Sequence, residues 1–423
     1  MKKLFLFAMF LFLTCESESI LMNHENVGLR KNSNRIVYLS ESGNDSNPGT
    51  ISKPVKTLRK AIELADGAAD IYATVGQYST PSRTDLNVSL YGGYSNDFSR
   101  KDSSNETVFL GTGYWGDPLP VIQVIERSNI IIDGITIQIG MSANGKPCAI
   151  YFERCDSTVI LQNCRIIGQI GGDAKGMSAI YINEASPKIL NNYIYGGTLN
   201  IDVDAVNGIK AVYSKSLIQG NVINAGKNQG CLHGIYSLYS KLRIFQNVIY
   251  GGESGESCYA CAIRTGKAIE SWDDSGSEDE IENNEIYGGI GNRTYAIIAS
   301  QGSIQKIRDN IIDGGAGTVV SIGIYVKTND HPYIFRNTFQ NCAYGSYEWN
   351  FGDYAPGETN NASCIRENMF RASARIFVHW YDEIENSEHD VSNLDDLVQT
   401  NEGLYSLKYW NNSAENVSQY IQK

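Results

Sequence analysis

Apolar and polar residues recur through the second half of the chain in one short phrase. An asparagine is followed two positions later by Ile or Phe and, in most copies, then by glycine or another small residue. The intervals between successive copies are 29, 26, 37, 26, 27 and 31 residues. A period of this length predicts a solenoid, in which each repeat buries its apolar face only against its neighbours. The phrase begins at Asn192, Asn221, Asn247, Asn284, Asn310, Asn337 and Asn368.

A second phrase, Gly or Ala followed by Ile, alternates with the first. Counted from Ile180 onward, the gap from this Ile to the next asparagine of the first phrase is 12 or 13 residues in all coils but one. Between Ile263 and Asn284 the gap is 21 residues, so this coil carries an insertion of about nine residues. The isoleucines of the second phrase are Ile150, Ile180, Ile209, Ile235, Ile263, Ile297 and Ile324.

The repeats are predicted to be strands. Apolar residues alternate with period 2 around the isoleucines, and β-branched and aromatic residues dominate. The chain lacks a regular leucine skeleton, and its repeats are shorter than propeller blades. We therefore predict an all-β, single-stranded parallel β-helix. Asparagine tolerates the left-handed backbone of a sharp corner, and stacked asparagines can hydrogen-bond as a ladder. The seven asparagines are interpreted as structural.

The residue after each isoleucine of the second phrase is expected to point outward. This column would be a stripe of aromatic rings interrupted by two cations, which suits sugar rings and hydroxyl-rich or uronic ligands. The alternative is that Tyr is simply a good strand residue. The column comprises Tyr151, Tyr181, Lys210, Tyr236, Arg264, Ile298 and Tyr325.

Lys210, Tyr236 and Arg264 are also the candidates for catalysis. A polysaccharide lyase needs a cation against the uronate carboxylate and a base for the neighbouring proton. A hydrolase needs paired carboxylates, for which Asp202 and Asp204 are candidates, although a solvated loop edge is the simpler interpretation. Trp272, in the acidic insertion, is a candidate ligand contact in a loop that could equally be only solvated.

The N-terminus has the features of an export signal. Lys2 and Lys3 precede an apolar run over residues 4–13, which is too short to span a bilayer as a permanent helix. Cys15, directly after it, resembles the lipid-modified cysteine of bacterial lipoproteins; simple secretion is the alternative. Residues 16–34 are expected to be a flexible tether.

Charge and cysteine content narrow the choice of partner. The net charge of −12 opposes binding to nucleic acid and also disfavours polyanionic glycans, although a locally basic groove could override it. Eight cysteines remain after Cys15, an even number that is compatible with disulfides in an exported chain. Cys231 and Cys258 occupy equivalent places on adjacent coils and are the best candidate pair. No metal site and no cofactor are expected, because the histidines do not cluster near the cysteines.

Residues 35–115 differ from the later coils. Ile36 begins a predicted strand, and the Gly43-Asn44-Asp45 and Pro54-Val-Lys-Thr motifs precede an amphipathic helix with Leu58, Ala61, Ile62 and Ala65 on one face. Val75-Gly-Gln-Tyr and Leu90-Tyr-Gly-Gly-Tyr follow. In this order the motifs resemble the N-terminal module of exported right-handed parallel β-helix proteins of the pectate-lyase-like superfamily. The resemblance implies a right-handed parallel β-helix and export from the cell. Many proteins of this kind are bacterial lipoproteins, and others resemble polysaccharide lyases.

The helix would then cap the first coil, covering its apolar core. The predicted organisation is a signal peptide (1–15), a tether (16–34), a cap with the first coils (35–115), a right-handed parallel β-helix (116–380) and a C-terminal cap (381–423). The leading hypothesis is a monomeric, lipid-anchored protein of the cell envelope, on an inner or outer membrane, that binds a glycan or host surface without catalysis. A polysaccharide lyase or glycoside hydrolase, and a purely structural envelope protein, are the alternatives.

Overall fold

The chain divides into two compact units, residues 1–33 and 34–423. The structure is a computed structural model, and what it describes belongs to the second unit. No described helix is both long and apolar enough to cross a membrane. The described residues are 35–99, 101–102, 104, 106–112, 119–140, 145–172, 174–199, 205–256, 258–266, 277–300, 304–327, 332–350, 364–371, 374–382, 387–391, 408–410 and 413–414.

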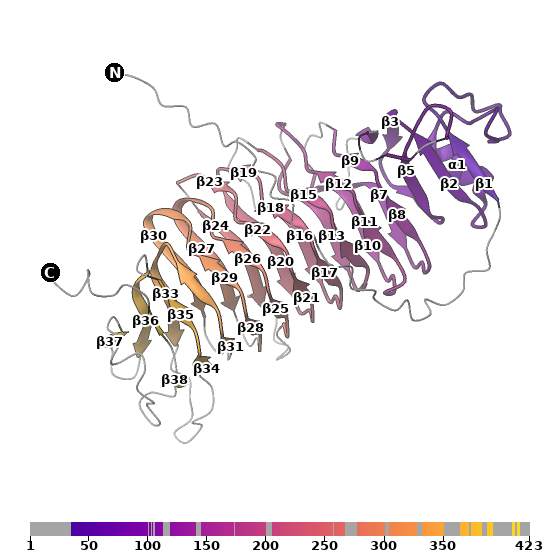
Figure 1. The fold of residues 1–423 in the computed structure, drawn as a ribbon. Coiled ribbons are helices and arrows are strands. Elements are labelled where there is room, and N and C mark those ends of the chain that lie inside the picture. Colours follow the sequence, from indigo (N-terminus) through magenta and orange to yellow (C-terminus); the bar gives the residue numbers. More distant parts are fainter. Residues whose placement is uncertain are drawn as a thin grey trace. The chain divides into compact units, whose positions relative to one another are not determined.

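The described chain winds through three sheets, here called sheets I, II and III, once per coil (Figure 1). A typical coil runs from a long strand of sheet II to a short strand of sheet I, turns sharply into a short strand of sheet III, and returns to sheet II. Strands of successive coils pair in parallel, with equivalent isoleucines opposite one another; Ile180 lies opposite Ile209, for example. The predicted parallel β-helix is therefore confirmed.

The described strands are assigned to the sheets as follows. Sheet I contains β1 (Ile36–Leu39), β2 (Asp70–Thr74), β5 (Leu90–Tyr94), β8 (Ile131–Asp133), β11 (Ile160–Gln162), β14 (Lys188–Leu190), β17 (Leu217–Gln219), β21 (Arg243–Phe245), β25 (Glu280–Glu282), β28 (Lys306–Arg308), β31 (Tyr333–Phe335), β34 (Cys364–Arg366) and β38 (Lys408–Trp410). Sheet II contains β4 (Thr84–Asp85), β7 (Leu119–Ile125), β10 (Pro147–Glu153), β13 (Met177–Asn183), β16 (Ala205–Val212), β19 (Lys227–Asn228), β20 (Cys231–Leu238), β23 (Glu253–Ser254), β24 (Tyr259–Gly266), β27 (Ile290–Ser300), β30 (Ala316–Val326), β33 (Cys342–Asn350), β36 (Ala374–Asp382) and β37 (Ser387–Val391). Sheet III contains β3 (Gly76–Pro81), β6 (Thr107–Thr112), β9 (Thr136–Gln138), β12 (Arg165–Ile167), β15 (Tyr193–Tyr195), β18 (Val222–Asn224), β22 (Val248–Tyr250), β26 (Glu285–Tyr287), β29 (Ile311–Asp313), β32 (Thr338–Gln340), β35 (Met369–Phe370) and β39 (Ser413–Ala414).

The core of each central coil includes one isoleucine or other apolar residue at an equivalent place on each of the three sheets. In one coil these are Ile180 from sheet II, Ile189 from sheet I and Ile194 from sheet III, all fully buried. Isoleucine suits this place because its branched side chain packs well against the next coil on the pleated surface. The sequence phrases contain two of these three columns. The third, on sheet I, lies three residues before each ladder asparagine.

The seven recurrent asparagines lie in single file at the corner between sheets I and III, as predicted. Each of the seven is buried. From Asn221 onward, the side-chain oxygen of each asparagine accepts hydrogen bonds from the backbone N–H and the side-chain amide of the asparagine one coil earlier. Asn247, for example, donates to Asn284 Oδ1 from its backbone (2.9 Å) and its side chain (3.0 Å). The ladder therefore satisfies buried polar groups along the stack.

The expectation that the ladder asparagines themselves adopt the left-handed corner conformation is wrong. The residue before each of them does so; Asn191 has φ of 53° and Gln246 has φ of 53°. This division follows from geometry, because the ladder side chain must point inward, and the residue before it makes the turn. Several residue types, including arginine and glutamate, occupy the turning position, so the hydrogen-bonding ladder is what requires asparagine.

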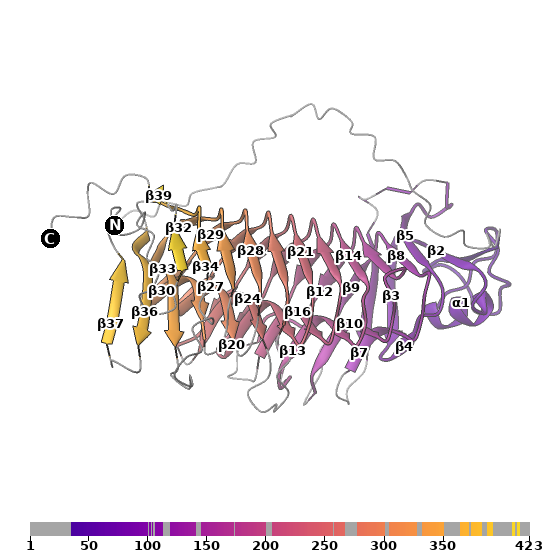
Figure 2. The ribbon, with the colours of Figure 1, turned by 90° about the horizontal axis from the view of Figure 1, so that it is seen from below.

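Helix α1 (Leu58–Ala65) forms where the sequence predicts it. Thr57 is the N-cap, and Leu58, Ala61 and Ala65 are buried in the same core cluster as the first coils, with Ile62 packed against it. Asp45 accepts hydrogen bonds from the backbone N–H groups of Lys56 and Thr57, each at 2.9 Å. These contacts give Asp45 a structural role at the helix start. Figure 2 shows α1 beside β2 and β3, with which it is in contact.

Two features concern the later coils. Strands β38 and β39 add in parallel to sheets I and III, so parallel coils continue beyond residue 380.

The insertion lies between β24 and β25, and its described base is closed by hydrogen bonds from Thr265 Oγ1 to Asp279 Oδ2 (2.6 Å) and from Ser277 Oγ to the carbonyl of Gly266 (2.9 Å). Burial raises the pKa of Asp279 to about 6.

Truncating a ladder asparagine tests this account of the fold. Asn247→Ala should lower the free energy of unfolding by about 2–3 kcal/mol, because it leaves the buried backbone N–H of Asn221 without its acceptor. Gln219→Ala is the matched control, since it removes an amide–amide hydrogen bond on the outer face and should cost less than about 0.5 kcal/mol. Urea unfolding followed by circular dichroism measures both. Equal losses in the two variants would contradict a stabilising role for the ladder.

Candidate binding pocket on sheet II

The predicted outer column is present on sheet II. Strand pairing places Tyr151, Tyr181, Lys210, Tyr236, Arg264, Ile298 and Tyr325 opposite one another on seven successive strands. The structure brings only the middle four together in one pocket. Tyr151 and Ile298 are almost fully buried, with 8% and 3% of their surface exposed, and Tyr325 lies outside the pocket. The column is thus less exposed than predicted.

Strand alternation is interrupted at the small residue of the second phrase, which the pairing registers skip. This interruption brings side chains from before and after it into one pocket. A Cβ on Gly234 would lie 2.6 Å from the carbonyl oxygen of Ala262 and 2.8 Å from Ile249 Cγ2, so only glycine fits there. Strict alternation would put His233 and Tyr236 on opposite faces of β20. Both line the pocket instead, while Ile235 between them packs in the core.

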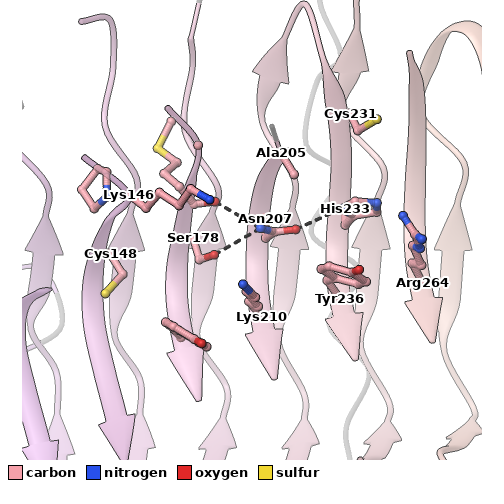
Figure 3. Close-up of a pocket in the computed structure, with 14 residues that line it drawn as sticks. Lys146, Cys148, Ser178, Ala205, Asn207, Lys210, Cys231, His233, Tyr236 and Arg264 are labelled. Carbon is pink, nitrogen blue, oxygen red and sulfur yellow. Dashed lines mark hydrogen bonds between the residues drawn. The ribbon is translucent and has the colours of Figure 1, made fainter. Parts of the chain in front are cut away.

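The pocket has a volume of about 290 Å³ and extends over five coils (Figure 3). It contains three cationic side chains, and none of its described lining residues is Asp or Glu. This local excess of positive charge contrasts with the net charge of −12 of the whole chain. The lining residues are Lys146, Pro147, Cys148, Gly176, Met177, Ser178, Tyr181, Ala205, Asn207, Lys210, Cys231, His233, Tyr236 and Arg264.

Tyrosine rings of the pocket contact two of its three cations. Lys210 Nζ lies 4.9 Å from the ring centre of Tyr181, and Arg264 Cζ lies 5.1 Å from that of Tyr236. The ring of Tyr236 also stacks on that of His233, with centroids 4.8 Å apart. These cation–π contacts fix where the charges lie.

A chain of hydrogen bonds crosses four coils beneath these groups. Arg264 Nη1 donates to the Tyr259 hydroxyl (2.7 Å), which lies 3.1 Å from His233 Nε2. His233 Nδ1 lies 2.9 Å from Asn207 Oδ1, so the proton of the ring is assigned to Nδ1. The Asn207 amide in turn donates to Ser178 Oγ (3.2 Å) (Figure 3). Every hydrogen bond in this series is thus donated in the same direction, from Arg264 toward Ser178.

Burial sets the protonation of this network. Burial, and secondly the charge of Arg264, hold the pKa of His233 well below its ordinary value of 6.5. Burial raises the pKa of Tyr259 to about 12, so its hydroxyl keeps its proton and can donate. Burial disfavours the charge of Arg264, but Tyr259 and Tyr236 raise its pKa. Arg264 is therefore a permanent cation and cannot act as the base of the lyase hypothesis, a role left to Lys210 or Tyr236.

Sequence reasoning missed the polar groups at the back of the pocket. Ser178, Asn207 and His233 each lie two residues before an isoleucine of the second phrase, so this column could have been found with the same alignment. Strict alternation puts these positions on the inner face with the isoleucines, and so predicts no pocket shared with the outer column. Tyr259 carries no such signal, because it lies at the irregular start of β24.

The structure contains a disulfide between Cys231 and Cys258, the pair expected from the sequence. Cys155, Cys164, Cys261 and Cys342 have free, buried thiols, and Cys148 is also buried. Among the described residues no three His, Cys, Asp or Glu side chains are grouped to hold a metal ion. The candidates Cys15, Asp202, Asp204 and Trp272 lie outside the described residues.

Comparison with known proteins identifies a family for the chain. The profile of the family described as "Protein of unknown function (DUF1565)" matches residues 41–330. No protein of curated function matches in sequence.

Solved structures with similar folds share little sequence with the chain. A Dettilon tailspike protein is 12% identical, with a TM-score of 0.44, over 82% of this chain and 68% of its own. The catalytic domain of a GH87 alpha-1,3-glucanase in complex with nigerose is 12% identical, with a TM-score of 0.38, over 83% and 61%. The pectate lyase Pel9A is 14% identical, with a TM-score of 0.31, over 81% and 76%. The chain thus spans about three fifths to three quarters of the length of these structures.

The buried neutral histidine predicts a pH-dependent stability. Below pH 6.5 the unfolded chain takes up a proton that native His233 does not, so the free energy of unfolding falls with pH by up to about 1.4 kcal/mol per unit from this group. His233→Gln lacks this contribution. Urea unfolding at pH 7 and pH 5 should show a larger loss in the wild type than in the variant. The same loss in both would show that His233 protonates in the folded state.

Proposed function

Since the chain belongs to the DUF1565 family, whose profile spans every strand of the pocket, the family description leaves the function open and the pocket is the guide to it. We propose that the protein binds an acidic glycan along sheet II. The observation that carries the proposal is the set of three cations, Lys146, Lys210 and Arg264, in a pocket whose described lining has no carboxylate. An acidic protein that concentrates positive charge at one concave site is suited to a ligand that carries carboxylate or sulfate groups.

The neutral groups of the pocket suit the rest of such a ligand. Ser178, Asn207 and His233 are hydroxyl, amide and uncharged imidazole groups, held in place by hydrogen bonds to one another. A preorganised set of neutral polar groups next to cations matches the mixture of hydroxyl and acidic groups in an acidic sugar. Because the lining comes from successive coils, an extended chain can cross several of them.

A polysaccharide lyase is the second candidate. The observation in its favour is that strand pairing places Tyr236 between Lys210 and Arg264 within one pocket. Arg264 would neutralise a uronate carboxylate, and Lys210 or Tyr236 would remove the neighbouring proton. The same binding experiment, followed by ultraviolet absorbance for the unsaturated product, separates a lyase from a binding protein.

We also propose that the protein is exported and anchored in the cell envelope through a lipid on Cys15. The charged start, the short apolar run and the cysteine after it support this proposal. The Cys231–Cys258 disulfide is in keeping with an oxidising compartment.

The binding proposal predicts the effect of removing one cation. Lys210→Ala should weaken binding to polygalacturonate, alginate or chondroitin sulfate about tenfold, because a hydrogen bond to a charged group contributes about 1.5–3 kcal/mol. Affinity is measured by isothermal titration calorimetry at fixed ionic strength. Lys241→Ala is the control for net charge, since Lys241 pairs with Glu278 at 2.8 Å outside the pocket and should leave the affinity unchanged. If the wild type binds none of the three acidic polymers, the proposal is wrong.

The anchoring proposal predicts that Cys15→Ser moves the protein from the membrane to the soluble fraction. Without its thiol the chain cannot receive a lipid, and the apolar run alone is too short to hold it in a bilayer. Fractionation of cells that express the full chain, with detection by immunoblot, measures the shift. Cys155→Ser, a buried cysteine of the coils, is the control. Membrane retention of Cys15→Ser would exclude a lipid on this residue.

A further inference from the structure

The Cys231–Cys258 disulfide lies at the start of the two strands that carry the central groups of the pocket. Cys231 is the first residue of β20, two residues before His233, and itself lines the pocket. Cys258 directly precedes Tyr259, the first residue of β24. The disulfide thus joins the chain segments that present His233 and Tyr259 to each other.

Regular strand pairing does not hold Tyr259 beside β20. Pairing between β20 and β24 begins with Leu232 opposite Ala260, and Tyr259 is paired on its other side, with Arg293 of β27. Continued in register, Cys231 would face Tyr259; instead it is bonded to Cys258. At this point the disulfide, and not backbone pairing, joins the start of β20 to the residue before β24.

Tyr259 is the link between the cation and the neutral part of the pocket. Its hydroxyl accepts a hydrogen bond from Arg264 Nη1 (2.7 Å) and lies 3.1 Å from His233 Nε2. Its ring packs edge-on against those of His233 and Tyr295, with centroids 5.6 and 5.5 Å apart. Tyr259 itself does not line the pocket. Any effect it has on a ligand passes through Arg264 and His233.

We propose that Tyr259, held by the Cys231–Cys258 disulfide, is the positioning residue of the pocket, and that ligand binding therefore depends on the disulfide being oxidised. This inference rests on the proposed binding function. Without the hydroxyl, Arg264 keeps its charge but loses the partner that directs its guanidinium group, and His233 loses the donor at Nε2. Without the disulfide, the start of β24 is free to move away from β20, with the same effect on both groups.

A thermodynamic cycle on the full chain tests the proposal. Affinities for polygalacturonate, alginate and chondroitin sulfate are measured for the wild type and Tyr259→Phe, each with the disulfide oxidised and reduced by dithiothreitol. Tyr259→Phe should bind about tenfold more weakly than the oxidised wild type. Reduction should weaken the wild type by a similar factor and leave Tyr259→Phe nearly unchanged, because both changes remove one coupled contact. Cys231→Ser with Cys258→Ser should reproduce the effect of reduction.

Tyr295→Phe is the matched control, since Tyr295 lies on the next coil, touches the Tyr259 ring and does not line the pocket. It should bind as the wild type does. Equal affinities of Tyr259→Phe and the wild type would overturn the proposal. Additive losses from reduction and from Tyr259→Phe would also overturn it, because the disulfide would then act elsewhere.

A spectroscopic measurement decides the inference independently of any ligand. In protein labelled with ¹⁵N-histidine, the His233 Nε2 resonance should move toward that of a nitrogen without a hydrogen bond, both in Tyr259→Phe and after reduction of the wild type. An unchanged resonance in the reduced protein would contradict a link between the disulfide and Tyr259. A wild type that binds none of the three polymers but shows this shift would contradict the proposed function and leave the positioning role of Tyr259 supported.

Discussion

Vertical register between coils is the constraint on which the rest of the structure depends. Each coil of the ladder contributes one core residue from each of the three sheets to the repeating columns, and one corner asparagine. Each of these must lie directly above its equivalent for the core to pack and for the ladder to close. A shift of one residue in any strand would turn its isoleucine outward and leave a buried amide without a partner. Apolar packing and hydrogen bonding thus select the same register. Every side chain of the pocket is placed by it, because the pocket is made from positions fixed relative to the core isoleucines.

The repeating part of this arrangement could be predicted from the sequence. The corner asparagines, two isoleucine columns, the outer column and helix α1 follow from spacing and alternation, since parallel stacking turns equal spacing into vertical neighbours. The third isoleucine column, represented by Ile189, was equally open to prediction. The left-handed backbone conformation was assigned to the wrong residue. Asparagine suits both a left-handed corner and an inward-pointing ladder position, so its presence alone does not show which of the two it occupies.

The pocket was less predictable, because it depends on departures from the repeat. The break in alternation at Gly234 places His233 and Tyr236 in the same pocket, and a rule of strict alternation cannot anticipate that break. Tyr259 acts from a place where backbone pairing has not yet begun. Burial, which decides that His233 is neutral and that Arg264 remains charged, comes from the surrounding coils. Candidate residues could therefore be found in the column, but their roles could not.

The hydrogen bonds at the base of the insertion have a wider consequence. Thr265 directly follows Arg264, and its hydrogen bond to Asp279 joins the described residues on the two sides of the insertion. After the insertion the coil continues at β25, which pairs with β21 in the regular parallel register. The position of Arg264 therefore does not depend on the insertion: its length and charge can change in evolution while the coils hold the cation in place.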